Sequence, residues 1–246
     1  MKQRFIDTTS RALWCCRRLP RCLRGKDLFL TKQLRIPVRK FGSGYGAWTV
    51  GNTLLQPGGL AYCFGLGLEV SLEVALATEL QLEVHGFDPT PRSLAWLSQQ
   101  SPAPPFHVHP WAIGVEDGES TFNMPANPDH ISMSAVRSSG MAGTFVAQVR
   151  TLESIHTELG NDRSIALLKM DIEGSEYGVL NALCDGKLRP TQIAVEFHHR
   201  FPEFGPQATR LAVSNLAKAG YAIADVSPNG EEVLFVHATS LAGSPS

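Results

Sequence analysis

From residue 60 onward, short apolar segments alternate with segments of helical periodicity, and no other feature constrains the fold of this chain as strongly. Buried strands are predicted at Leu60–Phe64, Leu82–Phe87, Phe106–Ile113, Ile165–Met170 and Gln192–Phe197, with an outlying strand at Glu119–Asn123. Helices are predicted at Val70–Leu80, Pro91–Gln99, Thr151–Leu159, Glu176–Leu183 and Pro206–Ala219. Strands that alternate with helices are typical of a mainly parallel sheet that helices cover on both faces.

The last two predicted strands, Tyr221–Val226 and Glu232–Val236, differ from the others because only five residues separate them. A parallel crossover needs roughly a dozen residues or more, so these two strands are expected to be antiparallel neighbours. The chain is therefore predicted to form a Rossmann-like α/β fold with seven strands in a mainly parallel sheet and an antiparallel C-terminal strand.

Charge is divided unevenly between the N-terminal segment and the rest of the chain. Residues 1–40 contain twelve Lys or Arg and two acidic residues, whereas the remainder contains ten basic and 21 acidic residues. We therefore divide the chain into a basic extension (residues 1–40), a folded domain (41–240) that begins with a glycine-rich hinge over residues 41–47, and a flexible tail (241–246). A helix is predicted in the extension from Ser10, and Pro20 is expected to end it. The extension is expected either to dock on the acidic body or to make peripheral contact with an anionic surface.

The five cysteines, Cys15, Cys16, Cys22, Cys63 and Cys184, have neither the even number nor the spacing of a disulfide framework or a zinc site. No apolar run approaches the ~20 residues that a membrane span needs. The sequence therefore predicts reduced thiols in a cytoplasmic protein.

A glycine turn follows the first predicted strand, where Gly65 and Gly67 let the backbone turn tightly and approach a ligand. Asp88 lies 21 residues after Gly67, near the spacing of about 20 that is typical of a carboxylate bound to ribose hydroxyls. Asp88 could also cap the helix that begins near Pro91. Because ligands of open α/β sheets bind beyond the carboxyl ends of the strands, these residues predict a nucleotide-type cofactor site.

Glu69 and Val70, which follow this turn, distinguish between NAD and S-adenosylmethionine as the cofactor. The dinucleotide fingerprint has Gly or Ala at the position of Val70, and Glu69 would place a negative charge beside a pyrophosphate. A carboxylate suits the sulfonium and amino group of S-adenosylmethionine better. The glycine turn therefore favours S-adenosylmethionine over NAD.

A second polar group follows the fourth and fifth predicted strands. Asp171 and Glu173 come directly after one strand, and Glu196 and His198 lie at the end of the next. These four side chains are expected to cluster at the cleft and to act as catalytic groups. The cluster could deprotonate a hydroxyl directly, which we favour, or hold a divalent cation that lowers the pKa of the hydroxyl, as in catechol-type methyltransferases.

Several of these segments together resemble the FkbM-type methyltransferase family. The matching segments are Tyr45–Trp48, Phe64–Ser71, His85–Pro91, Trp111–Gly114, Lys169–Glu176 and Glu196–His198. The resemblance implies a class I methyltransferase fold, S-adenosylmethionine as cofactor, Gly65 and Gly67 as the cofactor turn, Asp88 as the ribose ligand, and Trp111 and Ala112 beside the adenine. Many family members have an acidic residue in place of Cys63 and glycine in place of Glu69, so we expect Glu69 to supply part of the missing carboxylate's role.

Taken together, these features predict an S-adenosylmethionine-dependent methyltransferase that methylates a hydroxyl of a small molecule, natural product or sugar. An NAD-dependent oxidoreductase is the first alternative, and a non-catalytic module that binds membrane or nucleic acid through the basic extension is the second. An acidic body repels phosphates, so no stable nucleic-acid partner is expected. His199 is expected at the surface, and residues Asn127–Ser139, which include His130, are expected to form a lid or insert over the substrate.

Overall fold

The computed structural model describes residue 14 and residues 17–100, 105–125, 141–160 and 162–241. Its main sheet has seven strands, β3 (Leu60–Phe64), β4 (Glu83–Phe87), β5 (Phe106–His109), β9 (Ile165–Met170), β10 (Gln192–Glu196), β11 (Tyr221–Val226) and β12 (Glu232–His237). They are arranged in the order β11-β12-β10-β9-β3-β4-β5. Strand β12 is antiparallel to both of its neighbours, and all other pairs are parallel. The predicted fold class is confirmed.

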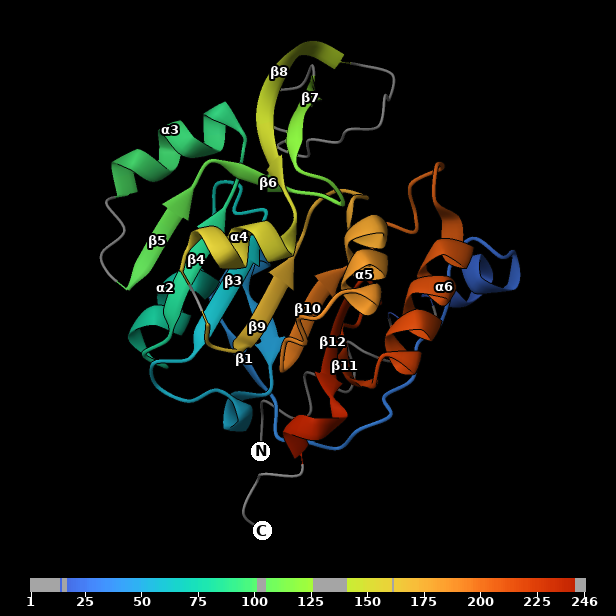
Figure 1. The fold of residues 1–246 in the computed structure, drawn as a ribbon. Coiled ribbons are helices and arrows are strands. Elements are labelled where there is room, and N and C mark those ends of the chain that lie inside the picture. Colours follow the sequence, from blue (N-terminus) through green and yellow to red (C-terminus); the bar gives the residue numbers. More distant parts are fainter. Residues whose placement is uncertain (1–13, 15–16, 101–104, 126–140, 161, 242–246) are drawn as a thin grey trace.

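Helices cover both faces of this sheet (Figure 1), and the alternation of side chains along β3 shows why. Tyr62 and Phe64 pack with α4 (Leu152–Glu158), α5 (Glu176–Asp185) and α6 (Gly205–Lys218) in one hydrophobic core. Ala61 and Cys63 point to the opposite face, where α2 (Ser71–Thr78), α3 (Pro91–Gln100) and the hairpin of β1 (Arg39–Phe41) and β2 (Trp48–Val50) form a second core. Both faces of the strand are thus buried, which explains its unbroken apolar sequence.

One predicted strand, Phe106–Ile113, is divided in the structure. Strand β5 ends at His109, and β6 (Trp111–Ile113) begins after Pro110 and joins a different sheet. Proline has no N–H to donate to a strand ladder, so the break falls at Pro110. The prediction of a single strand was wrong because it gave no weight to this proline.

The second sheet has the order β6-β8-β7, with β7 at Gly118–Pro125 and β8 at Met141–Arg150. Strand β7 confirms the outlying strand predicted at Glu119–Asn123. Strand β8 was not predicted, because half-buried and exposed residues alternate along it without a clear apolar face. The predicted lid Asn127–Ser139 and its His130 lie outside the described residues.

The N-terminal segment packs on the domain through a buried carboxylate. Asp27 is fully buried and pairs with Arg18, His199 and Arg200 at 3.2, 3.0 and 3.0 Å. Burial alone would raise the pKa of Asp27, but hydrogen bonds from Arg18, His199 and the N–H of Leu28 outweigh it and hold this pKa well below its usual range. The segment is therefore tied to the residues that follow β10.

The helical segment at residues 17–23 passes through Pro20, so the predicted helix end at this proline was wrong. Pro20 still offers its carbonyl, which accepts the N–H of Arg24 at 3.3 Å. The glycine-rich residues 41–47 form the turn of the β1–β2 hairpin, and Gly42 and Gly44 have the positive φ angles that favour glycine.

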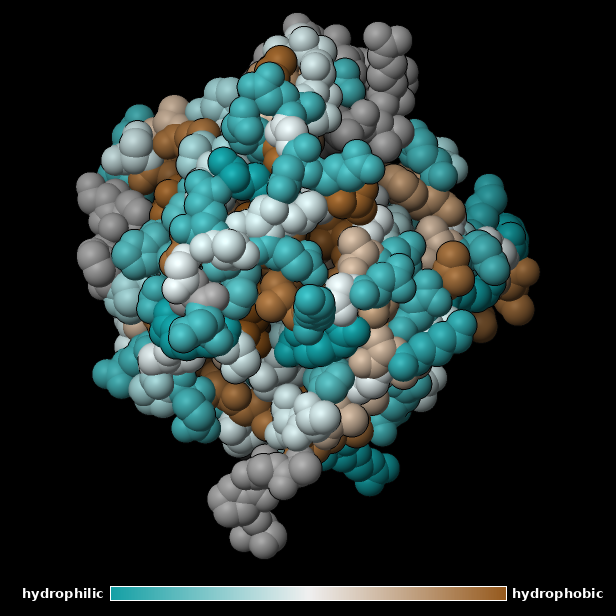
Figure 2. Space-filling model, viewed as in Figure 1, coloured by the Kyte–Doolittle hydropathy of each residue, from teal (hydrophilic) through white to brown (hydrophobic). Residues whose placement is uncertain are grey.

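Basic and apolar side chains remain exposed on this segment. Arg17, Arg21 and Lys26 are exposed, as is Leu23 at 79%. Figure 2 shows hydrophobic atoms at the edge of the molecule where the segment lies in Figure 1. Contact with an anionic surface stays a prediction. Among the described residues, no helix is both long and apolar enough to cross a bilayer, and Cys22, Cys63 and Cys184 are free thiols.

Replacing Asp27 by Asn is expected to destabilise the protein by about 3 kcal/mol at pH 7, because the substitution leaves the buried Arg18 and the half-buried Arg200 without their carboxylate. The folded-state pKa of Asp27 is depressed, so its stabilisation is present above the unfolded pKa of about 3.9 and is lost as pH falls. Urea unfolding at pH 7 and pH 3 should show a smaller difference between wild type and Asp27→Asn at pH 3. An equal difference at both pH values would contradict this account, and Asp162→Asn, at an exposed loop position, is the control.

Candidate active site

A cavity of about 540 Å³ lies at the carboxyl ends of β3, β4 and β9. Its volume is in the range of small-molecule and cofactor sites. Its lining includes all six predicted cofactor residues, Gly65, Gly67, Glu69, Asp88, Trp111 and Ala112, and two of the four predicted catalytic residues, Asp171 and Glu173. The structure therefore brings together the glycine turn and the acidic segment Asp171–Glu176, which are about a hundred residues apart in sequence.

The turn after β3 requires glycine for two separate reasons. Gly65 and Gly67 have φ angles of +77° and +59°, which side chains other than glycine rarely adopt. A Cβ atom at residue 65 would also overlap the backbone carbonyl of Asp171. The turn therefore lies directly against the first residue of the acidic segment.

Asp88 holds this turn in place. Its carboxylate accepts hydrogen bonds from the N–H of Gly67 and the N–H of Thr90, both at 2.8 Å. The bond from Thr90 orders the start of α3, so Asp88 can both cap this helix and bind a ligand. A carboxylate has about four lone-pair sites, so two backbone bonds leave capacity for ribose hydroxyls.

Carboxylates line the other side of the turn. Glu69 accepts the N–H and the hydroxyl of Ser71 at 2.9 and 3.0 Å, which fixes it at the start of α2. Glu73, which sequence reasoning missed, is buried from α2 against Cys63 and also lines the cavity. Burial raises the pKa of Glu73, while the ammonium group of Lys169 acts in the opposite direction. The sequence does contain a signal for Glu73, because this acid lies between Leu72 and Leu76, two apolar residues on the buried face of the helix.

Aromatic rings form the part of the cavity between β4 and β6. Trp111 lies 6.2 Å from Phe87 in a stacked arrangement, and Phe87 stacks on Phe64 at 4.4 Å. Ala112 also lines this part of the cavity. These apolar surfaces fit a flat heterocycle such as adenine.

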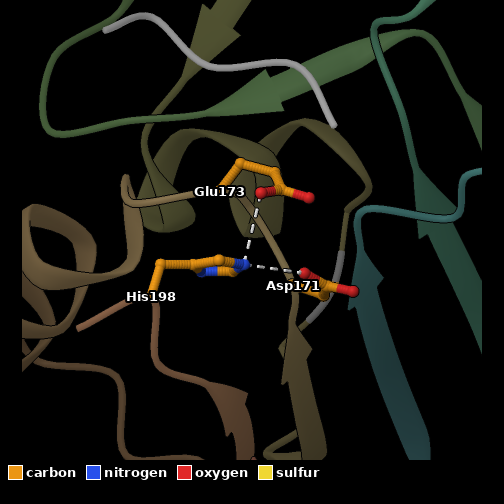
Figure 3. Close-up of side chains that lie close together, drawn as sticks. All are labelled: Asp171, Glu173 and His198. Carbon is orange, nitrogen blue, oxygen red and sulfur yellow. Dashed lines mark ion pairs between the residues drawn. The ribbon is translucent and has the colours of Figure 1, made fainter. Parts of the chain in front are cut away.

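The predicted catalytic residues lie at the ends of β9 and β10, which pair in parallel with Val195 opposite Met170. Nε2 of His198 is 3.6 Å from Oδ1 of Asp171 and 3.3 Å from Oε2 of Glu173 (Figure 3). Burial and the neighbouring Asp171 raise the pKa of Glu196 to about 8. Glu196 and His198 lie behind Asp171 and Glu173 and are not part of the cavity lining. All four predicted residues therefore form one cluster, but only Asp171 and Glu173 reach the cavity.

Glu176 lies in the first turn of α5, as expected, and it also supports this cluster. It is fully buried and its Oε1 accepts the backbone N–H of His198 at 2.9 Å and contacts Nδ1 of His198 at 3.2 Å. Burial alone would lower the pKa of His198, but Glu176, Glu173 and Asp171 outweigh it and raise this pKa to about 9.

His199 was expected at the surface, and this was wrong. It is 1% exposed, and its Nε2 lies 3.0 Å from Oδ1 of Asp27. The N-terminal segment covers this histidine, a long-range contact that local sequence does not show. The ammonium group of Lys169 donates to the carbonyls of Phe64 and Gly65 at 3.3 and 2.7 Å.

Comparison with known proteins agrees with this geometry. The family described as the methyltransferase FkbM domain matches residues 74–223, more than half of the chain. This match includes Asp88, Trp111 and the segment Lys169–Glu176, and it begins after the glycine turn. The chain belongs to the FkbM methyltransferase domain family and is an S-adenosylmethionine-dependent methyltransferase. The NAD-dependent alternative is thereby excluded.

The solved structures that match this chain are distant from it in sequence. A fibrillarin from Methanococcus jannaschii has a TM-score of 0.44 at 11% identity, covering 75% of this chain and 67% of that one. Aeropyrum pernix fibrillarin in complex with S-adenosylmethionine has 0.41 at 10%, covering 83% and 86%. A TehB-like methyltransferase from Corynebacterium glutamicum has 0.37 at 9%, covering 94% and 100%. No curated protein matched the sequence.

Replacing Glu69 by Ala is expected to weaken S-adenosylmethionine binding about tenfold, because the substitution removes a carboxylate from the wall where the cation of the cofactor would lie. Isothermal titration calorimetry measures this affinity. Because Glu69 also accepts hydrogen bonds from Ser71 at the start of α2, the titration should be made well below the unfolding temperature of the variant. Glu116→Ala, at an exposed position outside the cavity, is the control, and an affinity equal to that of wild type in Glu69→Ala would contradict the assignment.

Proposed function

We propose that this methyltransferase transfers the methyl group of S-adenosylmethionine to a hydroxyl oxygen of a small molecule, natural product or sugar. The observation that carries the proposal is that one cavity is lined both by the cofactor residues and by the carboxylates of Asp171 and Glu173. A hydroxyl is a weak nucleophile until it loses its proton, and these carboxylates lie where such an acceptor would reach the cofactor.

The shape and charge of the cavity residues fit S-adenosylmethionine. The glycine turn admits close approach of a ligand, Asp88 faces the turn, and the aromatic rings of Trp111 and Phe87 suit adenine. Glu69 and Glu73 add negative charge at the end where the sulfonium and amino groups would lie. A dinucleotide pyrophosphate would be repelled by the same two carboxylates.

When bound, S-adenosylmethionine supplies an electrophilic methyl group on a positively charged sulfur. The glycine turn and Asp88 would hold the nucleoside, so that the methyl carbon faces the acidic cluster. Methyl transfer would form a bond from the acceptor oxygen to this carbon and break its bond to sulfur, and the electron pair of the broken bond would stay on sulfur. Asp171 and Glu173, which line the cavity, would draw the hydroxyl proton away from the oxygen during this displacement, and Glu196 and His198 lie behind them.

The direct test is incubation of the full chain with S-adenosylmethionine and a panel of polyols, sugars and phenols, with mass spectrometry to locate any added methyl group. The proposal expects an added methyl ether and formation of S-adenosylhomocysteine. Methylation found at nitrogen or carbon across the panel, and not at oxygen, would contradict it.

Asp171→Asn is expected to lower kcat by about 10²- to 10⁴-fold, the usual effect of losing a group that assists proton transfer. Affinity for S-adenosylmethionine should stay close to wild type, because the Asp171 backbone that packs on Gly65 is retained. Steady-state kinetics and calorimetry on the same preparation separate these effects, with Asp185→Asn, exposed at the end of α5, as the matched control. A kcat equal to that of wild type in Asp171→Asn would remove this residue from the mechanism.

A further inference from the structure

Three side chains from two strand ends point toward the same space at the wall of the cavity (Figure 3). They are Asp171, Glu173 and His198, and one nitrogen or oxygen atom from each lies within 4.8 Å of the others. We propose that these residues are the ligands of one divalent metal ion of the Mn²⁺ class, at the acceptor end of the cofactor cavity. The inference rests on the proposed function for the role of the ion, but not for its binding.

The distances suit a shared cation better than direct hydrogen bonds. A charge-assisted hydrogen bond between imidazolium and carboxylate is about 2.7–2.9 Å long. Nε2 of His198 is instead 3.3 Å from Glu173 and 3.6 Å from Asp171. Two ligands at about 2.1 Å from one cation, at tetrahedral or octahedral angles, lie about 3.0–3.4 Å apart. Of the two separations that involve His198, one lies in this range and the other is about 0.2 Å above it, and the two carboxylates lie within 4.8 Å of each other.

An independent observation concerns the opposite side of the imidazole. Glu176 is fully buried and accepts the backbone N–H groups of Gly174 and His198 at 2.8 and 2.9 Å. Its Oε1 is also 3.2 Å from Nδ1 of His198, which places an N–H at Nδ1. Nε2 therefore faces Asp171 and Glu173, and a cation bound there would displace its proton. A carboxylate behind a histidine is the usual arrangement around a metal-bound imidazole.

The turn that carries Glu173 is held by the same carboxylate. Glu173 has a φ of +52°, unusual for a residue other than glycine, and the N–H of the next residue, Gly174, is bonded to Glu176. Glu176 thus orients two of the three ligands at once. This common support explains why both converge although they come from different strand ends.

Access and composition indicate what kind of ion would fit. The side chains of Asp171 and Glu173 are 32% and 20% exposed and line the cavity, so an ion between them would keep open positions for an acceptor oxygen. Three protein ligands with open positions are typical of catalytic metal sites. One nitrogen and two carboxylate oxygens suit Mn²⁺, Fe²⁺ or Zn²⁺ and do not suit Cu(I), which prefers sulfur.

Such an ion would change how the hydroxyl loses its proton. A hydroxyl oxygen bound to a divalent cation has a lowered pKa, so its proton is released more readily to nearby solvent or carboxylate. The distances therefore favour the metal-assisted route over the direct proton transfer that we expected from the sequence.

The test is titration of the EDTA-treated and dialysed full chain with Mn²⁺, followed by electron paramagnetic resonance of the free ion. Wild type should bind one Mn²⁺ per chain, and Glu173→Gln and His198→Gln should each weaken binding about tenfold or more. Glu116→Gln, an exposed acid outside the cluster, should bind like wild type. Equal binding by wild type and both ligand variants, or binding by none of them, would overturn the inference.

S-adenosylmethionine affinity is measured on the same samples without metal. Affinity retained in Glu173→Gln shows that the variant is folded, so that a loss of Mn²⁺ binding reports on the site. If no hydroxyl acceptor is methylated, the proposed function fails while the Mn²⁺ result still stands. Where an acceptor is found, EDTA should abolish its methylation and Mn²⁺ should restore it, and full activity in EDTA would contradict the role of the ion.

Discussion

The close contact between the backbone at Gly65 and the carbonyl of Asp171 determines the geometry of both halves of the site. Strands β3 and β9 are parallel neighbours in register, with Phe64 opposite Met170, so both chains leave the sheet at the same edge. The N–H of Asp171 then donates to the carbonyl of Phe64 at 3.1 Å. Lys169 adds a bond from its ammonium group to the carbonyl of Gly65 at 2.7 Å. A side chain at residue 65 would separate the two segments and enlarge the site.

The same edge explains how a buried charge cluster is tolerated. Glu176 begins α5, where the free N–H groups of a helix favour negative charge, and it is further satisfied by His198. His198 is held by the loop after β10, and that loop is tied through His199 and Arg200 to Asp27 of the N-terminal segment. The basic extension is thus connected to the acidic cluster by a continuous chain of contacts.

The features that could be predicted from the sequence are those with a local signal. Strands β3, β9 and β11 were predicted with the bounds that the structure shows, because apolar residues dominate each of them. The residues that line the cavity follow such strands, so their convergence follows from the rule for parallel sheets. Strand β8 and the hairpin β1–β2 have mixed burial and weak periodicity. The roles of Asp27, Glu73 and Glu176 depend on partners far away in sequence, which no periodicity reports.

Cys63 and Glu73 show from which element a carboxylate reaches this end of the cavity. The resemblance described from the sequence implies an acidic residue at position 63, at the end of the first strand. Here the thiol of Cys63 is fully buried and lies against Glu73, which reaches it from α2. The carboxylate is therefore supplied from the helix instead of the strand, one layer further from the sheet. Because burial raises the pKa of Glu73 and nearby positive charge lowers it, a cationic ligand in the cavity would favour the ionised form, as Lys169 already does. Binding of the cofactor and ionisation of Glu73 would then support each other, and Glu69 alone would not have to replace the missing acid.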